Sequence, residues 1–146
     1  MAEQRTPTRA EWGDLSDLEV KHGYKLFGGK TVDEAMPLFI ENPIERSAEL
    51  RHAPAPVFNY YIFCFTEFLT SPKSEGESDS ASCFLRLVLD RMTTDPASLD
   101  RIYPKLKAAV DTVAKRQAFY DASADIYGSF VDLQEQIERH RANHDA

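Results

Sequence analysis

Residues 57–69 form the most apolar stretch of the chain, and their pattern predicts a central helix. The stretch contains six aromatic side chains. At about 100° of rotation per residue, one broad helix face carries Val57, Phe58, Tyr61, Ile62, Cys64, Phe65, Phe68 and Leu69. A fully buried strand is also compatible with so aromatic a run, but the length of the stretch and the spacing of Asn59, Thr66 and Thr70 favour a helix. A helix that is apolar over more than half of its circumference needs several neighbours to cover it, so we expect a core built from several helices.

Start and stop signals divide the residues before this stretch into short helices. Residues 8–11, 16–19 and 31–34 each have the Ser/Thr-x-x-Glu pattern of a capping box. The first helix should therefore begin at one of the first two boxes. Gly23 predicts its end near His22, because glycine readily adopts the left-handed conformation that follows many helices.

Prolines and polar tracts mark further boundaries. Pro37 predicts a kink or a break in the helix that starts at residue 31. Asn42 followed by Pro43 predicts another helix start, since asparagine caps helices and proline is tolerated at their first position. After the central helix, residues 71–80 are polar and lack periodicity, so we expect a flexible surface loop there.

A second apolar stripe begins after this tract and predicts a helix that packs against the central one. The stripe consists of Ala81, Phe84, Leu85, Val88, Leu89 and Met92. Residues 94–96 predict another helix start, and Pro104 predicts an interruption after Tyr103. The phase of the apolar positions changes near Gln117, which implies a bend or a new helix.

Together these elements predict an all-α protein: an irregular bundle of about six or seven helices around the central aromatic-rich helix. The length of 146 residues fits one domain. We therefore expect residues 1–146 to form a single globular helical domain. Chain ends commonly fray, so residues 1–8 and 141–146 are expected to be less ordered.

The net charge of the chain limits the classes of partner that we expect it to bind. The chain has a formal net charge of −7 and a pI of about 5.1. Binding to phosphates depends on clustered Lys and Arg, so nucleic acid is not the favoured partner, and a basic protein fits better. No apolar run reaches the roughly 18 residues of a membrane span, and no export signal is visible, so we expect a soluble cytoplasmic protein. Cys64 and Cys83 should be free thiols, and no cofactor is expected.

Two Glu-x-x-His patterns raise the possibility of a metal site. They are formed by Glu19 with His22 and by Glu49 with His52. Their spacing is that of the ligands in ferritin-like di-iron bundles, which also need a Glu from each of two further helices. Glu67 and Glu135 are the candidates for these positions. The alternative, which we take as the main hypothesis, is that both histidines lie at helix ends, where a cation interacts favourably with the dipole without a metal.

Residues 139–144, with the sequence Arg-His-Arg-Ala-Asn-His, resemble the Arg-x-x-x-x-His motif of HEPN-type ribonucleases. Members of that family are small all-helical proteins that often act as dimers. The resemblance covers six residues and implies that Arg139 and His144 would cooperate in RNA cleavage. The structural alternative is a solvated basic helix end that stabilises the helix dipole.

Tyr60 and Phe63 interrupt the otherwise polar side of the central helix, next to Asn59 and Glu67. Aromatic side chains flanked by polar groups suit protein interfaces, unless another helix covers them. We therefore predict a protein-binding module, such as an adaptor, an inhibitor or an immunity-type factor, that binds through these four residues. The expected partner is another protein, for which a basic charge fits, or a second copy of the chain in a homodimer. The RNA-cleaving enzyme is the alternative.

Overall fold

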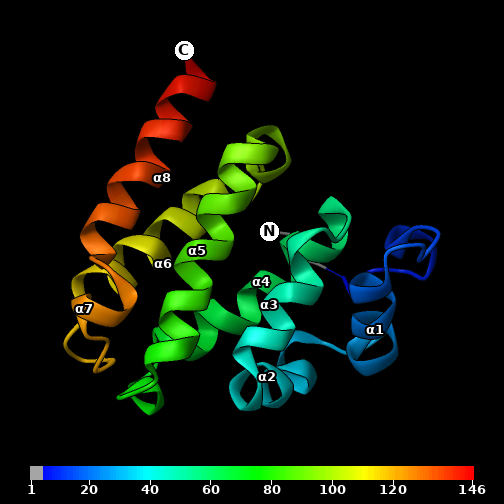
Figure 1. The fold of residues 1–146 in the computed structure, drawn as a ribbon. Coiled ribbons are helices and arrows are strands. Elements are labelled where there is room, and N and C mark those ends of the chain that lie inside the picture. The colour runs from blue at the N-terminus through cyan, green and yellow to red at the C-terminus, as the bar shows by residue number, and fades with distance from the viewer. Residues whose placement is uncertain (1–4) are drawn as a thin grey trace.

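A computed structural model describes residues 5–146, and every regular element in this part of the chain is a helix (Figure 1). The α-helices are α1 (Leu18–Phe27), α2 (Val32–Glu41), α3 (Pro43–Arg51), α4 (Ala55–Leu69), α5 (Ser78–Thr94), α6 (Tyr103–Lys115), α7 (Ala124–Tyr127) and α8 (Phe130–Asp145). Short 3-10 helices cover Ala10–Trp12, Pro72–Ser74 and Pro96–Leu99. None of these helices is both long and apolar enough to cross a membrane. The predicted irregular all-α bundle is confirmed for the described residues.

The aromatic-rich helix α4 lies in the core, as the sequence predicted. Eleven of its 15 residues are buried, and α2, α3 and α5 all pack against it. Phe27 of α1 and Phe39 of α2 contact each other, and they meet Tyr61 and Phe65 of α4, with ring centroids 4.8 to 5.3 Å apart. Aromatic pairs at such separations stabilise a core beyond the area that they bury. This cluster holds α1 and α2 on α4.

Helix α1 continues through Gly23, so the predicted helix end near His22 is wrong. A Cβ atom at Gly23 would lie 3.1 Å from the Glu49 Cβ atom and 3.1 Å from the Phe27 ring. The absence of a side chain therefore allows α1 to approach α3 closely. The helix ends instead at Gly28. Glycine serves both at helix ends and at close helix contacts, and the sequence alone did not distinguish the two uses.

Other local signals agree with the structure in part. The capping box at residues 31–34 is present. Helix α1, in contrast, is capped by Asp17 instead of Ser16, and Asn42 makes no side-chain capping bond at α3. Pro37 lies inside α2, which remains one helix. The start signals thus lie within two residues of the observed starts of α1, α2 and α3, but they did not identify every capping residue.

The polar tract at residues 71–80, where we expected a flexible surface loop, contains the 3-10 helix Pro72–Ser74 and the first residues of α5. Ser74 is fully buried, and its Oγ donates to the carbonyl oxygens of Leu69 at 3.1 Å and Ser71 at 2.8 Å. Ser80, in the first turns of α5, is also buried. Serine hydroxyls that bond to backbone carbonyls make a polar tract compatible with burial.

The change of phase near Gln117 marks the end of α6 and the start of a turn toward α8. The Gln117 side chain donates to the carbonyl oxygens of Ala122 at 2.9 Å and Gly128 at 2.8 Å, and it accepts from the Phe130 backbone N–H at 2.9 Å. One amide side chain thus holds this connection together. Pro104 does not interrupt the preceding helix but lies in the first turn of α6, where a missing N–H costs no hydrogen bond.

Residues 141–145, which we expected to be less ordered, belong to α8. Arg141 holds this end of the helix, because its Nη2 atom donates to Asp100 at 2.7 Å. At the other end of the chain, residues 1–4 lie outside the described part. Arg5 there pairs with Glu11 through two hydrogen bonds of 2.6 and 3.2 Å.

Helix α5 runs between α3 and α8 and contacts both of them (Figure 1). Its buried face lies toward α4 and the core. Its opposite side is flanked by α3 and α8. The three helices therefore form the sides and floor of a groove on the outside of the bundle.

Candidate functional site

The predicted binding surface on α4 is mostly covered, so its expected exposure is wrong. Tyr60 and Phe63 are only 8% and 5% exposed. The Tyr60 hydroxyl accepts from the Val32 backbone N–H at 3.2 Å, and the Lys105 ammonium lies 4.5 Å from the centroid of the Phe63 ring. Asn59, which is partly buried, donates to the carbonyl of Ser98 at 2.8 Å.

Glu67 is the one member of this predicted surface that lies in solvent. Its carboxylate is 3.8 Å from the Lys105 ammonium, and both side chains are more than half exposed. The segment from Pro96 to Lys105, together with α6, therefore covers the side of α4 that the sequence left open. The covering comes from residues about 40 positions away in the chain, which is why periodicity within α4 did not reveal it.

The two Glu-x-x-His patterns contribute one residue each to a shared contact between α1 and α3. His22 Nδ1 contacts Glu49 Oε2, although the two residues belong to different patterns. Glu49 also binds Arg46, with 2.6 Å from Arg46 Nε to Oε1 and 3.0 Å from Nη2 to Oε2. Arg46 and Glu49 are both buried, whereas the His22 side chain is half exposed.

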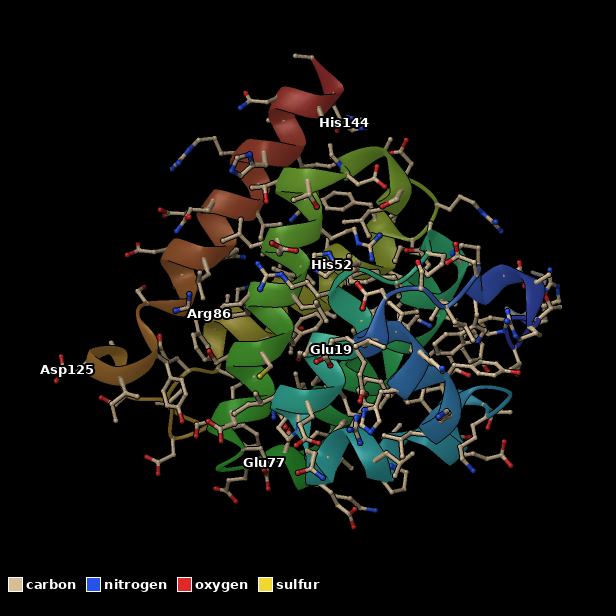
Figure 2. The ribbon with its side chains drawn as sticks, turned by 45° about the vertical axis from the view of Figure 1, so that its right-hand side comes forward. Glu19, His52, Glu77, Arg86, Asp125 and His144 are labelled. Carbon is tan, nitrogen blue, oxygen red and sulfur yellow. The ribbon has the colours of Figure 1, made fainter. Side chains whose placement is uncertain are left out.

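This contact is an ion-pair network and does not assemble the metal ligands that the sequence suggested. Glu19 lies on the exposed side of α1, and His52 follows α3 as its C-terminal capping residue (Figure 2). Within residues 5–146, no three His, Cys, Asp or Glu side chains are grouped in a way that could hold a metal ion. The ferritin-like alternative, including Glu67 and Glu135, is therefore not assembled. The helix-end role fails for His22, because α1 continues beyond it.

Arg139 and His144 do not meet. The His144 ring lies 3.2 Å from Asp100, and Arg141, rather than Arg139, binds the same carboxylate. Arg139 is exposed on α8. Five residues of helix separate the two side chains by about 140° around the axis, so they project from different sides of α8. Figure 2 shows His144 near the C-terminal end of α8.

A groove with a volume of about 650 Å³ lies between α3, α5 and α8. Its apolar lining comes from Ile44 and Ala48 of α3 and from Cys83, Leu87 and Leu89 of α5. Its charged or titratable lining comes from Arg51, Arg86, Asp90 and His140. We call this feature the α3/α5/α8 groove.

The depth of the groove follows from the burial of its lining. Leu87 on α5 is 5% exposed, whereas Ile44 on α3 is 63% exposed. Helix α5 therefore forms the floor, and Ile44 stands on the rim as one of the few large apolar side chains that the bundle leaves in solvent. A large exposed apolar side chain beside an apolar floor is the combination found in protein-binding surfaces.

Cys83 lies on the groove floor, and its environment makes it a poor nucleophile. The side chain is partly buried, and burial raises the pKa of the thiol. Since the thiolate is the reactive form, a raised pKa lowers its reactivity at neutral pH. Both cysteines are free, as the sequence predicted, and Cys64 is fully buried in α4.

A second hollow, of about 520 Å³, lies between the N-terminal segment, α4 and residues 97–102. It includes Asn59 and Tyr60 of the predicted binding surface. Its cations are Arg101 and Arg5, and Arg5 donates two hydrogen bonds to Glu11. None of the residues that line this hollow is an exposed large apolar side chain of the kind that Ile44 supplies to the α3/α5/α8 groove.

The sequence contained a signal for the groove that periodicity alone did not single out. Cys83 and Leu87 are apolar, yet they fall outside the stripe of α5 that faces the core. Ile44 is likewise apolar, and it is 63% exposed on α3, whereas Leu50 of the same helix is fully buried. Apolar residues left over on the outer sides of two adjacent helices indicate a surface that something else covers.

Comparisons with protein-family models, with curated proteins and with solved structures found no match for this chain. The function must therefore be inferred from the geometry of the molecule.

Proposed function

We propose that the chain is a protein-binding module that holds a segment of a partner protein in the α3/α5/α8 groove. It would act through this contact, as an adaptor, an inhibitor or an immunity-type factor does, and not by catalysis. The observation that carries the proposal is the apolar groove floor around Leu87 with Ile44 beside it. The Ile44 side chain is 63% exposed. An exposed isoleucine gains about 1.5 to 3 kcal/mol when a partner buries it fully.

The three helices also give the groove the rigidity that recognition needs. Helix α3 is fastened to α5 through Arg91, whose Nη2 atom donates to the Ala53 carbonyl at 2.8 Å. Helix α8 is fastened through Arg86, which donates to the Tyr127 carbonyl at 2.7 Å, just before α8 begins. A site built on fixed helices loses little conformational entropy when it binds.

The clusters of charged and titratable side chains elsewhere in the bundle favour a structural role for their histidines over a catalytic one. His22 is engaged by a carboxylate that also binds Arg46, and His144 is engaged by a carboxylate that also binds Arg141. In both cases the charges pair with one another across two helices or segments. Such pairs position elements of the fold, and the chemistry of a general base needs a free proton acceptor next to a substrate.

Site-specific crosslinking tests this proposal with the full chain. In a Cys83→Ser background, Thr93→Cys places a thiol at the end of the groove and Ala142→Cys places one on the far side of α8. Both positions are exposed, and Cys64 is buried and remains silent. Each thiol carries a benzophenone label during irradiation in an extract of the native source. A groove-binding protein should crosslink from position 93 and not from position 142.

The captured protein is then purified and titrated against the wild-type chain and two variants of it. Ala48→Tyr fills the groove with a neutral side chain, and Ala142→Tyr makes the same change at an exposed helix position outside it. We expect at least about tenfold weaker binding for Ala48→Tyr than for wild type or Ala142→Tyr, since blocking an interface centre costs 1 to 2 kcal/mol or more. Equal affinities, or crosslinks to a second copy of the chain alone, would refute binding of a partner in this groove.

A further inference from the structure

The lining of the α3/α5/α8 groove follows the spacing of helices. Ile44, Ala48 and Arg51 lie four and three residues apart on α3, and the same spacing relates three lining residues of α5: Cys83, Leu87 and Asp90. Each row spans about two turns, or roughly 10 Å along its helix. A groove with two such parallel rows has the length and direction to receive a short rod. An amphipathic helix with apolar residues at i, i+3, i+4 and i+7 is a rod of this kind.

Other modes of peptide recognition fit less well. An extended peptide gains affinity by adding a strand to a sheet edge, and the described residues contain no strand to extend. A polyproline segment docks between aromatic side chains, and the groove lining contains none. The groove shape thus favours a helix as the bound segment.

Some charged groups in the groove have an ion-pair partner within the chain, and one does not. Arg51 and Asp90 neutralise each other, with 3.2 Å between Arg51 Nη2 and Asp90 Oδ1. Arg86 has no carboxylate within ion-pair distance among the described residues, and its only hydrogen bond there is the one to the Tyr127 carbonyl. A guanidinium has five N–H donors, so most of those on Arg86 remain free. Figure 2 shows Arg86 on the side of α5 that faces α7 and α8.

Nearby acidic groups do not remove this local positive charge. Asp79, which lies close enough to affect the Cys83 thiol, accepts a hydrogen bond of 2.7 Å from the Tyr127 hydroxyl and forms no ion pair with Arg86 among the described residues. On α8 the groove is lined by Gln136 and His140, neither of which carries a negative charge. The groove therefore has an unpaired cation beside its apolar floor, although the chain as a whole has a net charge of −7.

We infer that the α3/α5/α8 groove binds an acidic amphipathic helix of a partner protein, with a carboxylate of that helix paired to Arg86. The inference rests on the proposed function and adds the chemistry of the partner. Net charge alone favoured a basic protein, but affinity and specificity depend on charges at the contact itself. A carboxylate can accept two parallel N–H bonds from one guanidinium, which fixes the register of the bound helix.

A displayed library of helical peptides tests the inference without knowledge of the natural partner. Each peptide of about 18 residues carries apolar residues at i, i+3, i+4 and i+7, and its other positions draw equally on Glu, Lys and Gln. Selection uses the wild-type chain, and the Ala48→Tyr variant removes peptides that bind elsewhere. We expect Glu to be enriched over Lys at one or two positions beside the apolar stripe. The selected peptides should also protect Cys83 from a thiol reagent.

Charge variants then assign the preference to Arg86. Arg86→Gln should weaken the binding of the selected peptides at least about tenfold, a size typical of a lost interfacial charge pair. Arg86→Lys should retain the preference for Glu, and Arg86→Glu should reverse it toward Lys. Arg139→Gln removes one positive charge from an exposed position outside the groove and should leave affinity unchanged. Circular dichroism and thermal unfolding verify that each variant folds.

Binding of a helix in the groove and the acidic charge of that helix are refuted by different results. If no selected peptide protects Cys83, the groove does not bind helices and the inference is refuted, whereas the proposed function is refuted by the crosslinking and titration results given above. If peptides protect Cys83 but show no enrichment of Glu, or bind Arg86→Gln as well as wild type, the acidic partner is refuted while groove binding stands. Enrichment of Lys over Glu would likewise overturn the inference.

Discussion

The guanidinium of Arg91 lies 4.2 Å from the centroid of the Phe58 ring, inside the core and with only 7% of the residue exposed. Its Nη2 atom donates to the carbonyl oxygens of Leu50, Arg51 and Ala53, where α3 ends. A cation at this place satisfies carbonyls that have no partner within the helix and stabilises the negative end of the helix dipole. Arg91 thus joins α5 to α3 and α4 and fixes two of the three helices around the groove.

Replacement of Arg91 should therefore destabilise the whole bundle. We expect Arg91→Met to lower the free energy of unfolding by about 3 kcal/mol, because charged hydrogen bonds contribute about 1.5 to 3 kcal/mol and a desolvated cation over an aromatic ring about 2, partly offset by the cost of burying the charge. Urea denaturation measures the change. Arg139→Met, at an exposed site, should change the free energy of unfolding by no more than about 0.5 kcal/mol. Equal effects of the two substitutions would show that Arg91 has no special role.

The buried carboxylate of Glu49 gives a second prediction. Glu49→Gln removes the negative charge that binds Arg46 and His22, and it leaves the buried Arg46 guanidinium with only the exposed Glu45 carboxylate, 3.2 Å away, as an ion-pair partner. Breaking a buried pair from one side typically costs about 3 to 5 kcal/mol, whereas the same change at the exposed Glu19 should cost less than about 0.5. Thermal unfolding with and without EDTA adds a separate test. A melting temperature that fell on addition of EDTA would indicate a bound metal and contradict the ion-pair assignment.

Phe63 distinguishes a covered α4 from an exposed one. Because its side chain is 5% exposed and lies under Lys105, Phe63→Ala should lower the free energy of unfolding by about 3 to 5 kcal/mol, as expected for a lost core phenylalanine. Phe65→Ala, in the middle of the buried face, is the matched comparison and should cost about as much. An unchanged melting temperature for Phe63→Ala would mean that this side of α4 faces solvent.

The contrast between Phe65 and Phe63 shows how far the sequence determines the fold. The apolar face with Phe65 was predictable, because periodicity within one helix marks the side that must be buried. The burial of Phe63 was not, since it depends on residues 96–105 folding back over α4, and no local pattern encodes that contact. Gly23 and Ser74 are similar cases, in which a residue typical of helix ends or loops is used for close packing.

The candidate site was harder to predict than the fold, for a related physical reason. A groove exists only where helices distant in the chain come together, and Ile44, Leu87 and His140 span nearly 100 residues. Each of these side chains is unremarkable on its own helix. Only their convergence around α5 makes an apolar floor with an adjacent cation.

The thiol of Cys83 should report on the groove through its pH dependence. Burial raises its pKa, so at any given pH a smaller fraction is thiolate than in an exposed cysteine, whose pKa is about 8.5. The labelling rate at pH 7 should therefore lie below that of a free thiol and should continue to rise above pH 8.5. Cys64 should remain unlabelled until urea unfolds the chain. Rapid labelling of Cys83 at pH 7 would contradict its burial on the groove floor.

Ile44 offers the most direct test of the claim that the groove binds a protein. Its side chain is 63% exposed, so Ile44→Ala should change the free energy of unfolding by no more than about 0.5 kcal/mol. The same substitution should weaken the binding of the purified partner about tenfold or more, because burial of an interface anchor contributes 1 to 2 kcal/mol or more. Calorimetric titration of that partner with the wild-type and Ile44→Ala chains measures the difference. Loss of affinity with retained stability is the predicted result, and equal affinity would contradict the assignment of the groove as the binding site.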